Sequence, residues 1–268
     1  MKHILVCVNY NSYDSLMKYL QSVDCAYERI KSKSSLTVLV ADNAIVRKEI
    51  ELEYGFQLSV VTTGDNLGYF GGATYAIKNS HTELNDADFI YISNVDLTMN
   101  DDFFEIIESE TFGKDIGCVA PTIYSNSEEK NRNPKIINRP TKKKMTLLCL
   151  MYRFPILYKV YTKLFYSKRK EKMQGRKDGI IYAPHGSFMA FRNNFSSFLT
   201  NMEYPVFLFG EEIYIAENLR MKKLKTLYYS KLKIEDSDHV STSKLKSKAF
   251  YRYNYEAMKF LTKEYFYE

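Results

Sequence analysis

The sequence predicts an α/β fold in which helices flank a mostly parallel central sheet. Two observations predict it: short apolar runs typical of buried strands, and stretches between them whose apolar residues share one helix face. The predicted strands are Ile4–Val8, Leu36–Ala41, Leu58–Thr62, Phe89–Ser93 and Gly117–Ala120. The predicted helices carry their apolar faces at Leu16, Tyr19, Leu20 and Val23, at Ala73, Ala76 and Ile77, and at Phe103–Ile107 after Asp101 and Asp102. Regular alternation of strand and helix favours parallel pairing.

Composition places the chain among globular proteins. Its 268 residues are 45% hydrophobic and 26% charged, which allows one large domain with a sizeable core. The net charge of +6 suits a phosphate-rich partner, whether a sugar nucleotide, nucleic acid or an anionic membrane. The four cysteines are scattered without a CxxC pair, which indicates a reducing, cytoplasmic setting. We expect no signal peptide, because the first apolar run, Ile4–Val8, is too short for its hydrophobic region. We expect no transmembrane helix, because no apolar run approaches ~20 residues.

The middle of the chain has a different character. Ser125–Lys144 is polar, with Asn, Pro and Lys throughout, and is predicted to be a mobile loop. Met145–Lys172 is apolar and aromatic, is interrupted by Pro155, and is flanked by Lys142–Lys144 and Lys168–Lys170. This basic, aromatic insertion is equally consistent with an interfacial helix pair on an anionic membrane and with an amphipathic helix packed on the core.

Two further elements complete the prediction. Strand character resumes over Ile180–Phe191, and apolar residues at helical spacing over Phe250–Phe266 predict a C-terminal helix. Packing of that helix on the core is favoured over a membrane or subunit contact. The chain contains neither internal repeats nor low-complexity segments.

The most informative cluster is Ile92–Asp96. Asp96 follows the apolar run Phe89–Ile92, so its carboxylate lies where a buried strand leaves the sheet. Open α/β sheets bind ligands in the crevice at that edge. A carboxylate in this position suits a hard cation such as Mg²⁺ carrying a diphosphate. The cluster therefore predicts a nucleotide-activated substrate.

Other predicted strand ends also carry polar groups. Asn9 and Tyr10 close the first strand, and Asp42 closes the second. Asp42 could accept hydrogen bonds from a ribose or base, although a turn or N-cap role is favoured when it is taken alone. Gly64–Gly72 follows the third strand, and its four glycines allow either close approach of the backbone to a ligand or a tight strand-to-helix turn. It matches neither the dinucleotide fingerprint nor a P-loop.

Three clusters in the second half could carry chemistry. In His185–Ser187 a structural His is the more common case, and Gly186 would let a substrate lie close to the backbone. Glu211 and Glu212 begin a helical pattern, where they either complement the helix dipole or include a general base. Near the end of the chain, His239 follows two aspartates, and imidazole beside carboxylates is a ligand set for Mn²⁺ or Mg²⁺.

Taken in order, the motifs NYN, ADNA, DNLGYFGGA, ISNVDL, HGSFMAFR and FLFGEEIYI, followed by a late His, are more specific than any one alone. Their order resembles family 2 glycosyltransferases of the glycosyltransferase-A fold, in particular the rhamnosyltransferase and galactofuranosyltransferase branch that builds bacterial surface polysaccharides. The resemblance covers nearly the whole chain and is weakest over Ser125–Gly179, where we expect acceptor choice to reside.

The resemblance implies one continuous catalytic domain of four segments. Residues 1–124 form the nucleotide-sugar-binding half, 125–179 the loop and basic aromatic insertion, 180–245 the acceptor and catalytic half, and 246–268 the C-terminal helix. The residues expected to bind the donor are Asn9, Tyr10, Asp42, Asn66, Gly68, Asn94 and Asp96, and those expected to bind the acceptor are His185, Gly186 and Ser187. Asp96, His239 and Asn94 would hold Mg²⁺ or Mn²⁺. Glu212 would be the catalytic base, with Glu211 beside it.

The implied function is metal-dependent, inverting transfer of a sugar from a nucleotide-diphosphate donor to a glycan or lipid-linked saccharide. We expect the protein in the cytoplasm at the inner face of the cell membrane, with peripheral membrane contact and without a nucleic-acid partner. Asn94 stands where relatives often have Asp, and Glu212 stands where Asp is common. The Asn94 departure motivates an alternative, a non-catalytic nucleotide-sugar or glycan-binding protein, whereas the presence of both Glu212 and His239 argues against it.

Overall fold

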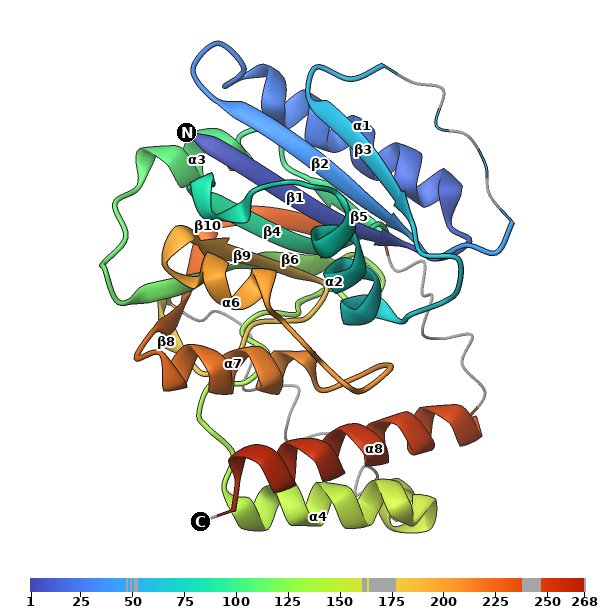
Figure 1. The fold of residues 1–268 in the computed structure, drawn as a ribbon. Helices are drawn as coiled ribbons and strands as arrows, with labels where there is room; N and C mark the ends of the chain where they lie inside the picture. Colours follow the sequence, from blue (N-terminus) through green and yellow to red (C-terminus); the bar gives the residue numbers. More distant parts are fainter. Residues whose placement is uncertain are drawn as a thin grey trace.

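The computed structural model describes residues 1–46, 48, 50, 53–160, 163, 177–237 and 247–267 of the chain. These residues build one ten-stranded sheet with the order β3-β2-β1-β4-β9-β6-β10-β5, and two short strands, β7 and β8, pair with β6 and β10. Helices cover both faces of the sheet (Figure 1). The architecture is the α/β fold that the sequence predicts.

The first half contains the predicted parallel strands. Its elements are β1 (Lys2–Asn9), α1 (Tyr13–Glu28), β2 (Ser35–Asp42), β3 (Gln57–Thr62), α2 (Tyr69–Asn79), η1 (Leu84–Asp86), β4 (Phe89–Asn94), β5 (Leu97–Met99), α3 (Phe103–Ser109) and β6 (Ile116–Ser125). β1 pairs in parallel with both β2 and β4, and β2 pairs in parallel with β3. All five predicted strands and all three predicted helices of this half are confirmed.

The second half supplies the antiparallel strands and the outer helices. Its elements are β7 (Lys130–Asn131), α4 (Lys142–Arg153), β8 (Gly179–Ile181), β9 (Phe188–Arg192), η2 (Asn193–Phe195), α6 (Ser196–Thr200), α7 (Glu211–Met221), β10 (Lys225–Asp236) and α8 (Ser247–Tyr265). β9 lies antiparallel between β4 and β6, whereas β10 runs parallel to β6. The sheet is therefore parallel on the β3 side and mixed on the β10 side.

Two apolar clusters fill the two faces of the sheet. Leu5 belongs to the cluster shared with α1 and α3, and its neighbour Val6 belongs to the cluster shared with α2, α7 and α8. Successive residues of a strand point to opposite faces, so a strand that is covered on both faces is apolar at every position. This is why β1 appears in the sequence as an uninterrupted apolar run.

The strand character predicted over Ile180–Phe191 corresponds to two strands, β8 and β9. β8 pairs antiparallel with β10, β9 pairs with β4 and β6, and residues 182–187 between them leave the sheet. Both short strands are apolar, and Ala183 and Pro184 between them are also buried. Apolar residues therefore continue on both sides of the break and conceal it in the sequence pattern.

The polar segment Ser125–Lys144 also differs from the mobile loop that was predicted. β7 folds back on β6, and Ile136 forms an isolated bridge with Ala183. Asn133 is fully buried, and its Nδ2 donates to the Pro121 carbonyl oxygen over 2.8 Å. Asn131 and Arg132 also bond to β6 and β10, so part of a segment whose composition resembles a loop is held on the sheet.

The insertion Met145–Lys172 is described as far as residue 160, together with residue 163. Helix α4 lies antiparallel to α8, and residues 155–160 are helical again (Figure 1). Met145 and Met151 are buried, while Leu147 and Leu150 are exposed. Met145 belongs to the apolar cluster shared with α8, so one face of α4 packs on the core, as in one of the two alternatives above. None of the helices in the described ranges is long and apolar enough to cross a membrane.

Candidate functional site

The register of the parallel strands gathers polar residues at one edge of the sheet. Asn9 of β1 pairs with Asp42 of β2, and Val8 of β1 pairs with Asn94 of β4. Because parallel strands end at the same edge, the first two motifs and the ISNVDL motif become neighbours there. The sheet thereby unites three of the predicted donor-binding positions.

Asn9 and Asp42 are bonded to each other inside the protein. The Asn9 Nδ2 donates to Asp42 Oδ1 over 2.9 Å, and the Tyr13 hydroxyl donates to Asp42 Oδ2 over 2.7 Å. Asn9 is fully buried and Asp42 nearly so, whereas Tyr10 is 40% exposed. Asp42 thus joins two strand ends to α1, and Tyr10 is the member of this group that faces solvent. Their donor-binding roles stay predictions.

The glycine-rich loop is shaped by contacts within the protein. Gly68 adopts φ 75°, and a Cβ at this position would overlap the carbonyl oxygen of Phe207. The Asn43 Nδ2 donates to the Gly68 carbonyl oxygen over 2.8 Å, and the Asn66 Oδ1 accepts from the Gly68 backbone N–H over 3.0 Å. Gly68 therefore allows close approach of one backbone segment to another, which joins the loop to the segment before α7.

Asp96 lies in the turn between β4 and β5. Burial, together with the nearby Asp236 carboxylate, raises the pKa of Asp96 to about 6, while Arg132 and Asn94 oppose the shift. The Arg132 Nη1 donates to Asp236 Oδ2 over 2.6 Å. Asp236 is the end of β10, which pairs with β5, so sheet pairing brings the second carboxylate to the predicted metal position.

The oxygen ligands at this turn fit a hard divalent cation. Asp96, Asn94 and Asp236 offer carboxylate and amide oxygens, and Mg²⁺ is commonly held by one or two carboxylates together with substrate phosphates. Asp236 lies close enough to Asp96 to raise the pKa of Asp96, and the same proximity of two carboxylates favours a bound cation. His239, predicted to complete the metal site, lies outside the described residues. Within the described ranges, no three His, Cys, Asp or Glu side chains gather into a metal-binding group.

Glu211 is an internal residue at the start of α7. It is 7% exposed, and its Oε1 accepts from the Phe209 backbone N–H over 2.9 Å. Burial, with a further contribution from the neighbouring Glu212, raises the pKa of Glu211 to about 8. A carboxyl that is mostly protonated at neutral pH is a poor proton acceptor. Glu211 therefore holds the loop before α7 in place.

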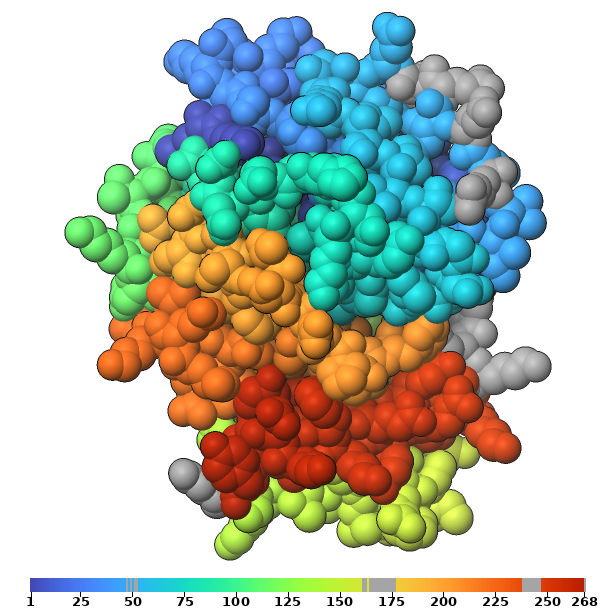
Figure 2. Space-filling model, in the orientation of Figure 1, coloured from blue at the N-terminus to red at the C-terminus, as the bar shows by residue number. Residues whose placement is uncertain are grey.

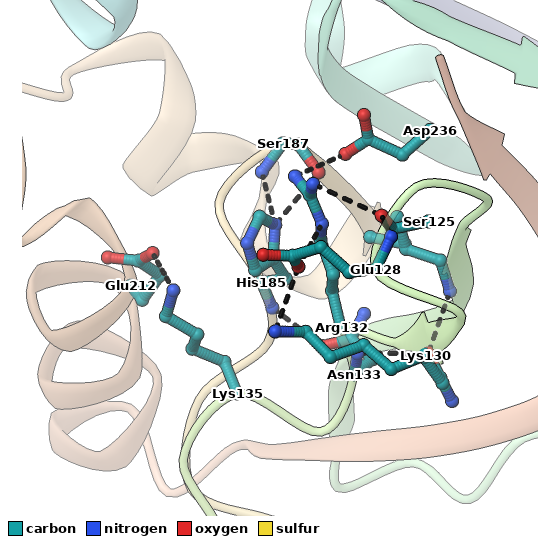
Figure 3. Close-up of polar contacts among 12 residues, drawn as sticks. Ser125, Glu128, Lys130, Arg132, Asn133, Lys135, His185, Ser187, Glu212 and Asp236 are labelled. Atoms are coloured by element: carbon teal, nitrogen blue, oxygen red, sulfur yellow. Dashed lines mark hydrogen bonds and ion pairs between the residues drawn. The ribbon is translucent and has the colours of Figure 1, made fainter. Parts of the chain in front are cut away.

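Glu212 points the other way, toward the His185–Ser187 loop. A Cβ built on Gly186 would lie 3.2 Å from Glu212 Oε1, and the Lys135 Nζ lies 4.0 Å from the same oxygen. Figure 3 shows Lys135 directed at this carboxylate. Glu212 is only partly buried. It is the member of the acidic pair that a bound substrate could reach.

The loop that carries His185 is held by the polar segment before α4. The His185 backbone N–H donates to Asn133 Oδ1 over 2.7 Å, and the Ser187 backbone N–H donates to His185 Nδ1 over 3.2 Å (Figure 3). Burial and the nearby cations Lys135, Arg132 and Lys130 lower the pKa of His185 well below its usual value. The imidazole is therefore neutral at pH 7, with Nδ1 as an acceptor.

Three residues of the site were missed at the sequence level. Arg132 and Lys135 lie in the polar segment whose composition resembles a loop, and a basic residue there carries no periodic signal. Tyr69, the first residue of α2, has a buried hydroxyl without a hydrogen-bond partner in the described part of the protein. Burial and then Glu211 raise the pKa of Tyr69 well above its usual value, with a smaller effect from Asp96. In the sequence, Tyr69 cannot be distinguished from an ordinary aromatic core residue.

Comparison with known proteins identifies the fold. No protein-family model and no curated protein sequence matches the chain. The structure of GalNAc-T7 with UDP, GalNAc and Mn²⁺ superposes with a TM-score of 0.53 at 11% identity, over 88% of this chain and 43% of that chain. The structure of S. aureus TarS 1-349 in complex with UDP-GlcNAc superposes with a TM-score of 0.54 at 10% identity, over 92% of this chain and 62% of that chain.

These structures share the mixed central sheet flanked by helices. The predicted glycosyltransferase-A fold is thereby confirmed. The chain spans less than two thirds of the length of either protein. At such low identity the likeness extends to the fold alone, and the predicted family 2 branch stays a prediction.

Proposed function

We propose that the protein is an inverting glycosyltransferase that moves a sugar from a nucleotide-diphosphate donor to a glycan or lipid-linked saccharide. One observation carries the proposal: in a glycosyltransferase-A fold, the partly buried Glu212 carboxylate faces the Gly186 loop while its neighbour Glu211 is internal. This division leaves one carboxylate side chain within reach of a substrate hydroxyl. The two structural neighbours described above contain UDP or UDP-GlcNAc, which supports a nucleotide-sugar donor.

The donor would lie along the carboxyl edge of β1, β2 and β4. Asp96, with Asn94 and Asp236 beside it, would hold Mg²⁺ or Mn²⁺, and a cation there supplies Lewis-acid stabilisation of the leaving diphosphate. The Asn9–Asp42 pair fixes the strand ends against which the nucleoside would pack. Tyr10 is exposed at the same edge and can contact the donor.

Glu212 would act as the general base. The acceptor hydroxyl oxygen forms a bond to the anomeric carbon as the bond from that carbon to the diphosphate oxygen breaks, and the hydroxyl proton passes to Glu212. Attack opposite the leaving group inverts the anomeric configuration. Gly186 leaves room for an acceptor beside the carboxylate, and the Lys135 Nζ lies 4.0 Å from Glu212 Oε1.

The wider setting is also part of the proposal. The resemblance over the ordered motifs favours synthesis of bacterial surface polysaccharide at the inner face of the membrane. The net charge of +6 suits both a phosphate-bearing donor and an anionic membrane surface. An acceptor attached to a lipid would be met at that surface.

The test is the Glu212→Gln variant, measured for donor binding and for transfer. We expect at least about a 100-fold loss of transfer, because a neutral amide cannot accept the proton. Donor binding, followed as the rise in melting temperature with UDP- and GDP-sugars and Mn²⁺, should persist. The control is Glu203→Gln, which removes an exposed carboxylate elsewhere. Normal turnover by Glu212→Gln would exclude this residue as the base.

A non-catalytic nucleotide-sugar or glycan-binding protein is the second candidate. It is favoured by Asn94, which places a neutral amide where relatives often carry a carboxylate, and so weakens cation binding. A radiolabelled-donor assay of the unaltered protein with Mn²⁺ or Mg²⁺ separates the two candidates. Donor binding without release of nucleotide or formation of labelled product would favour this second function.

A further inference from the structure

A cleft of about 470 Å³ lies on the outer helical pair, away from the sheet edge described above. It is an open cleft bordered by the end of α4, the helical residues 155–160 and the first turns of α8. In Figures 1 and 2 these helices form one end of the molecule, with β2 and β3 at the other. The cleft is therefore a separate feature from the Asp96 and Glu212 region.

The cleft is cationic. Arg153, Lys159, Lys248 and Arg252 line it, and none of the nine lining residues in the described part of the chain is acidic. The Arg252 Nε lies 3.9 Å from Glu256 Oε1, one turn along α8, and both side chains are largely exposed. An exposed ion pair at that distance contributes little, so it does not prevent Arg252 from binding another anion. The lining therefore favours a ligand with concentrated negative charge.

Tyrosine side chains fill the spaces between the cations. Tyr152, Tyr251 and Tyr255 line the same cleft, and the Arg153 Nη1 approaches the Tyr255 hydroxyl at 3.5 Å. Guanidinium groups bind phosphate oxygens through paired N–H donors, and phenol hydroxyls can donate to the remaining oxygens. Tyrosine is also enriched where protein meets the membrane interface. This chemistry matches a phosphate headgroup.

An exposed apolar row adjoins the cleft. Its members are 44% to 77% exposed: Leu147, Leu150, Phe154, Ile156, Leu157 and Val160. Leu147, Leu150 and Phe154 follow one another at spacings of three and four, which places them on one side of the helix. Lys143 and Lys144 are exposed at the start of the same helix. Apolar side chains beside cations are the pattern of a helix that lies in a membrane interface.

We propose that the cleft and the adjoining row form a docking site for an anionic phospholipid bilayer. The cleft would take the phosphate of one lipid headgroup, and the apolar row would enter the boundary between headgroups and acyl chains. Charge complementarity selects this occupant, because four clustered cations match the negative surface of such a bilayer. The apolar row would bury no surface if the ligand were a soluble anion.

Docking in this way would orient the candidate active site. The ring centroids of Phe250 in α8 and Phe209 lie 5.4 Å apart in an edge-to-face contact, and those of Phe207 and Tyr253 lie 5.0 Å apart. These contacts join the first turns of α8 to the loop that leads into Glu211. The bilayer would therefore lie on the side from which a lipid-linked acceptor arrives, and this consequence alone rests on the proposed function.

The test is co-sedimentation of the full chain with vesicles. Binding is expected to vesicles of phosphatidylglycerol and phosphatidylcholine in equal parts, and not to phosphatidylcholine alone. The double variant Arg153→Gln/Arg252→Gln should weaken the vesicle partition coefficient about 10- to 30-fold, because each basic residue near the surface contributes about 1 kcal/mol. Ile156→Ser should weaken it about fivefold through lost apolar insertion.

The matched control is Lys31→Gln/Lys33→Gln, which removes two exposed cations near the loop before β2 and should leave binding unchanged. Equal binding of the Arg153→Gln/Arg252→Gln variant and its parent would overturn the proposal. So would a rise in melting temperature with inorganic phosphate in the absence of vesicle binding, since that identifies a soluble anion. Because Glu212→Gln should still bind vesicles, failure of the docking site and failure of the transferase proposal are distinguishable.

Discussion

At the carboxyl ends of β1 and β2, Asn9 and Asp42 are buried and bonded to each other, whereas at the start of α7 Glu212 is partly buried and faces Gly186 and Lys135. The first region is closed by its own hydrogen bonds. The region at the start of α7 presents the Glu212 carboxylate to a space that a substrate can enter. Both regions belong to the same candidate site.

The difference separates residues that stabilise the fold from a residue that could act on a substrate. Buried polar groups that bond one another keep strand ends and loops in register, so a change there should reduce stability. A partly buried carboxylate contributes less to folding, so a change near Glu212 should alter transfer more than stability. Three substitutions test this division, from the largest expected effect on free energy to the smallest.

Gly68→Ala should destabilise the protein by about 3 to 5 kcal/mol. Its positive φ strains any L side chain, and its Cβ would overlap the Phe207 carbonyl oxygen, which is backbone and must move as a unit. Urea denaturation of the variant measures the loss. Gly64→Ala is the matched control, because Gly64 also has positive φ but nothing lies within 4 Å of its Cβ, so about 1 kcal/mol is expected. Equal losses of unfolding free energy in the two variants would contradict the close approach of Gly68 to the Phe207 carbonyl oxygen.

Glu211→Gln should change how stability depends on pH. Folding raises the Glu211 pKa from 4.5 to about 8, so its contribution is fully present below pH 4.5 and is lost as the pH rises through about 8. Gln cannot ionise and keeps an oxygen for the Phe209 N–H. Relative to the parent, the variant should gain about 4 kcal/mol in its free energy of unfolding between about pH 5 and pH 9, as measured by urea denaturation. A constant difference across that range would show that Glu211 ionises normally.

Gly186→Ala should impair transfer while leaving the fold intact. The new Cβ would lie 3.2 Å from Glu212 Oε1, so the carboxylate must shift by a few tenths of an ångström. A displaced base should lower kcat/KM about 5- to 20-fold, and the free energy of unfolding should change by less than about 1 kcal/mol. Gly179→Ala is the control, since nothing lies within 4 Å of its Cβ. Loss of stability without loss of transfer would place Gly186 in the supporting region instead.

The predictability of the site followed the same division. Asn9, Asp42 and Asp96 could be proposed from the sequence because Asn9 and Asp42 end apolar strands and Asp96 lies two residues after one, and the end of a strand is visible in a single segment of sequence. Arg132 and Lys135 were not, because their segment is polar and has no periodicity. Their importance arises from contacts with Asp236 and Glu212, which are distant in the chain.

The sequence by itself determined the parallel half of the sheet, the polar ends of its strands and the order of the motifs. These features depend on local periodicity, because a strand covered on both faces must be apolar along its length. Only the tertiary structure decided that β9 enters antiparallel between β4 and β6, that Gly68 meets Phe207, and which of Glu211 and Glu212 faces outward. The physical reason is that the burial of a residue and the charges around it depend on contacts between distant segments. Glu211 and Glu212 are adjacent in one helix, so only the packing of that helix decides which of them is buried.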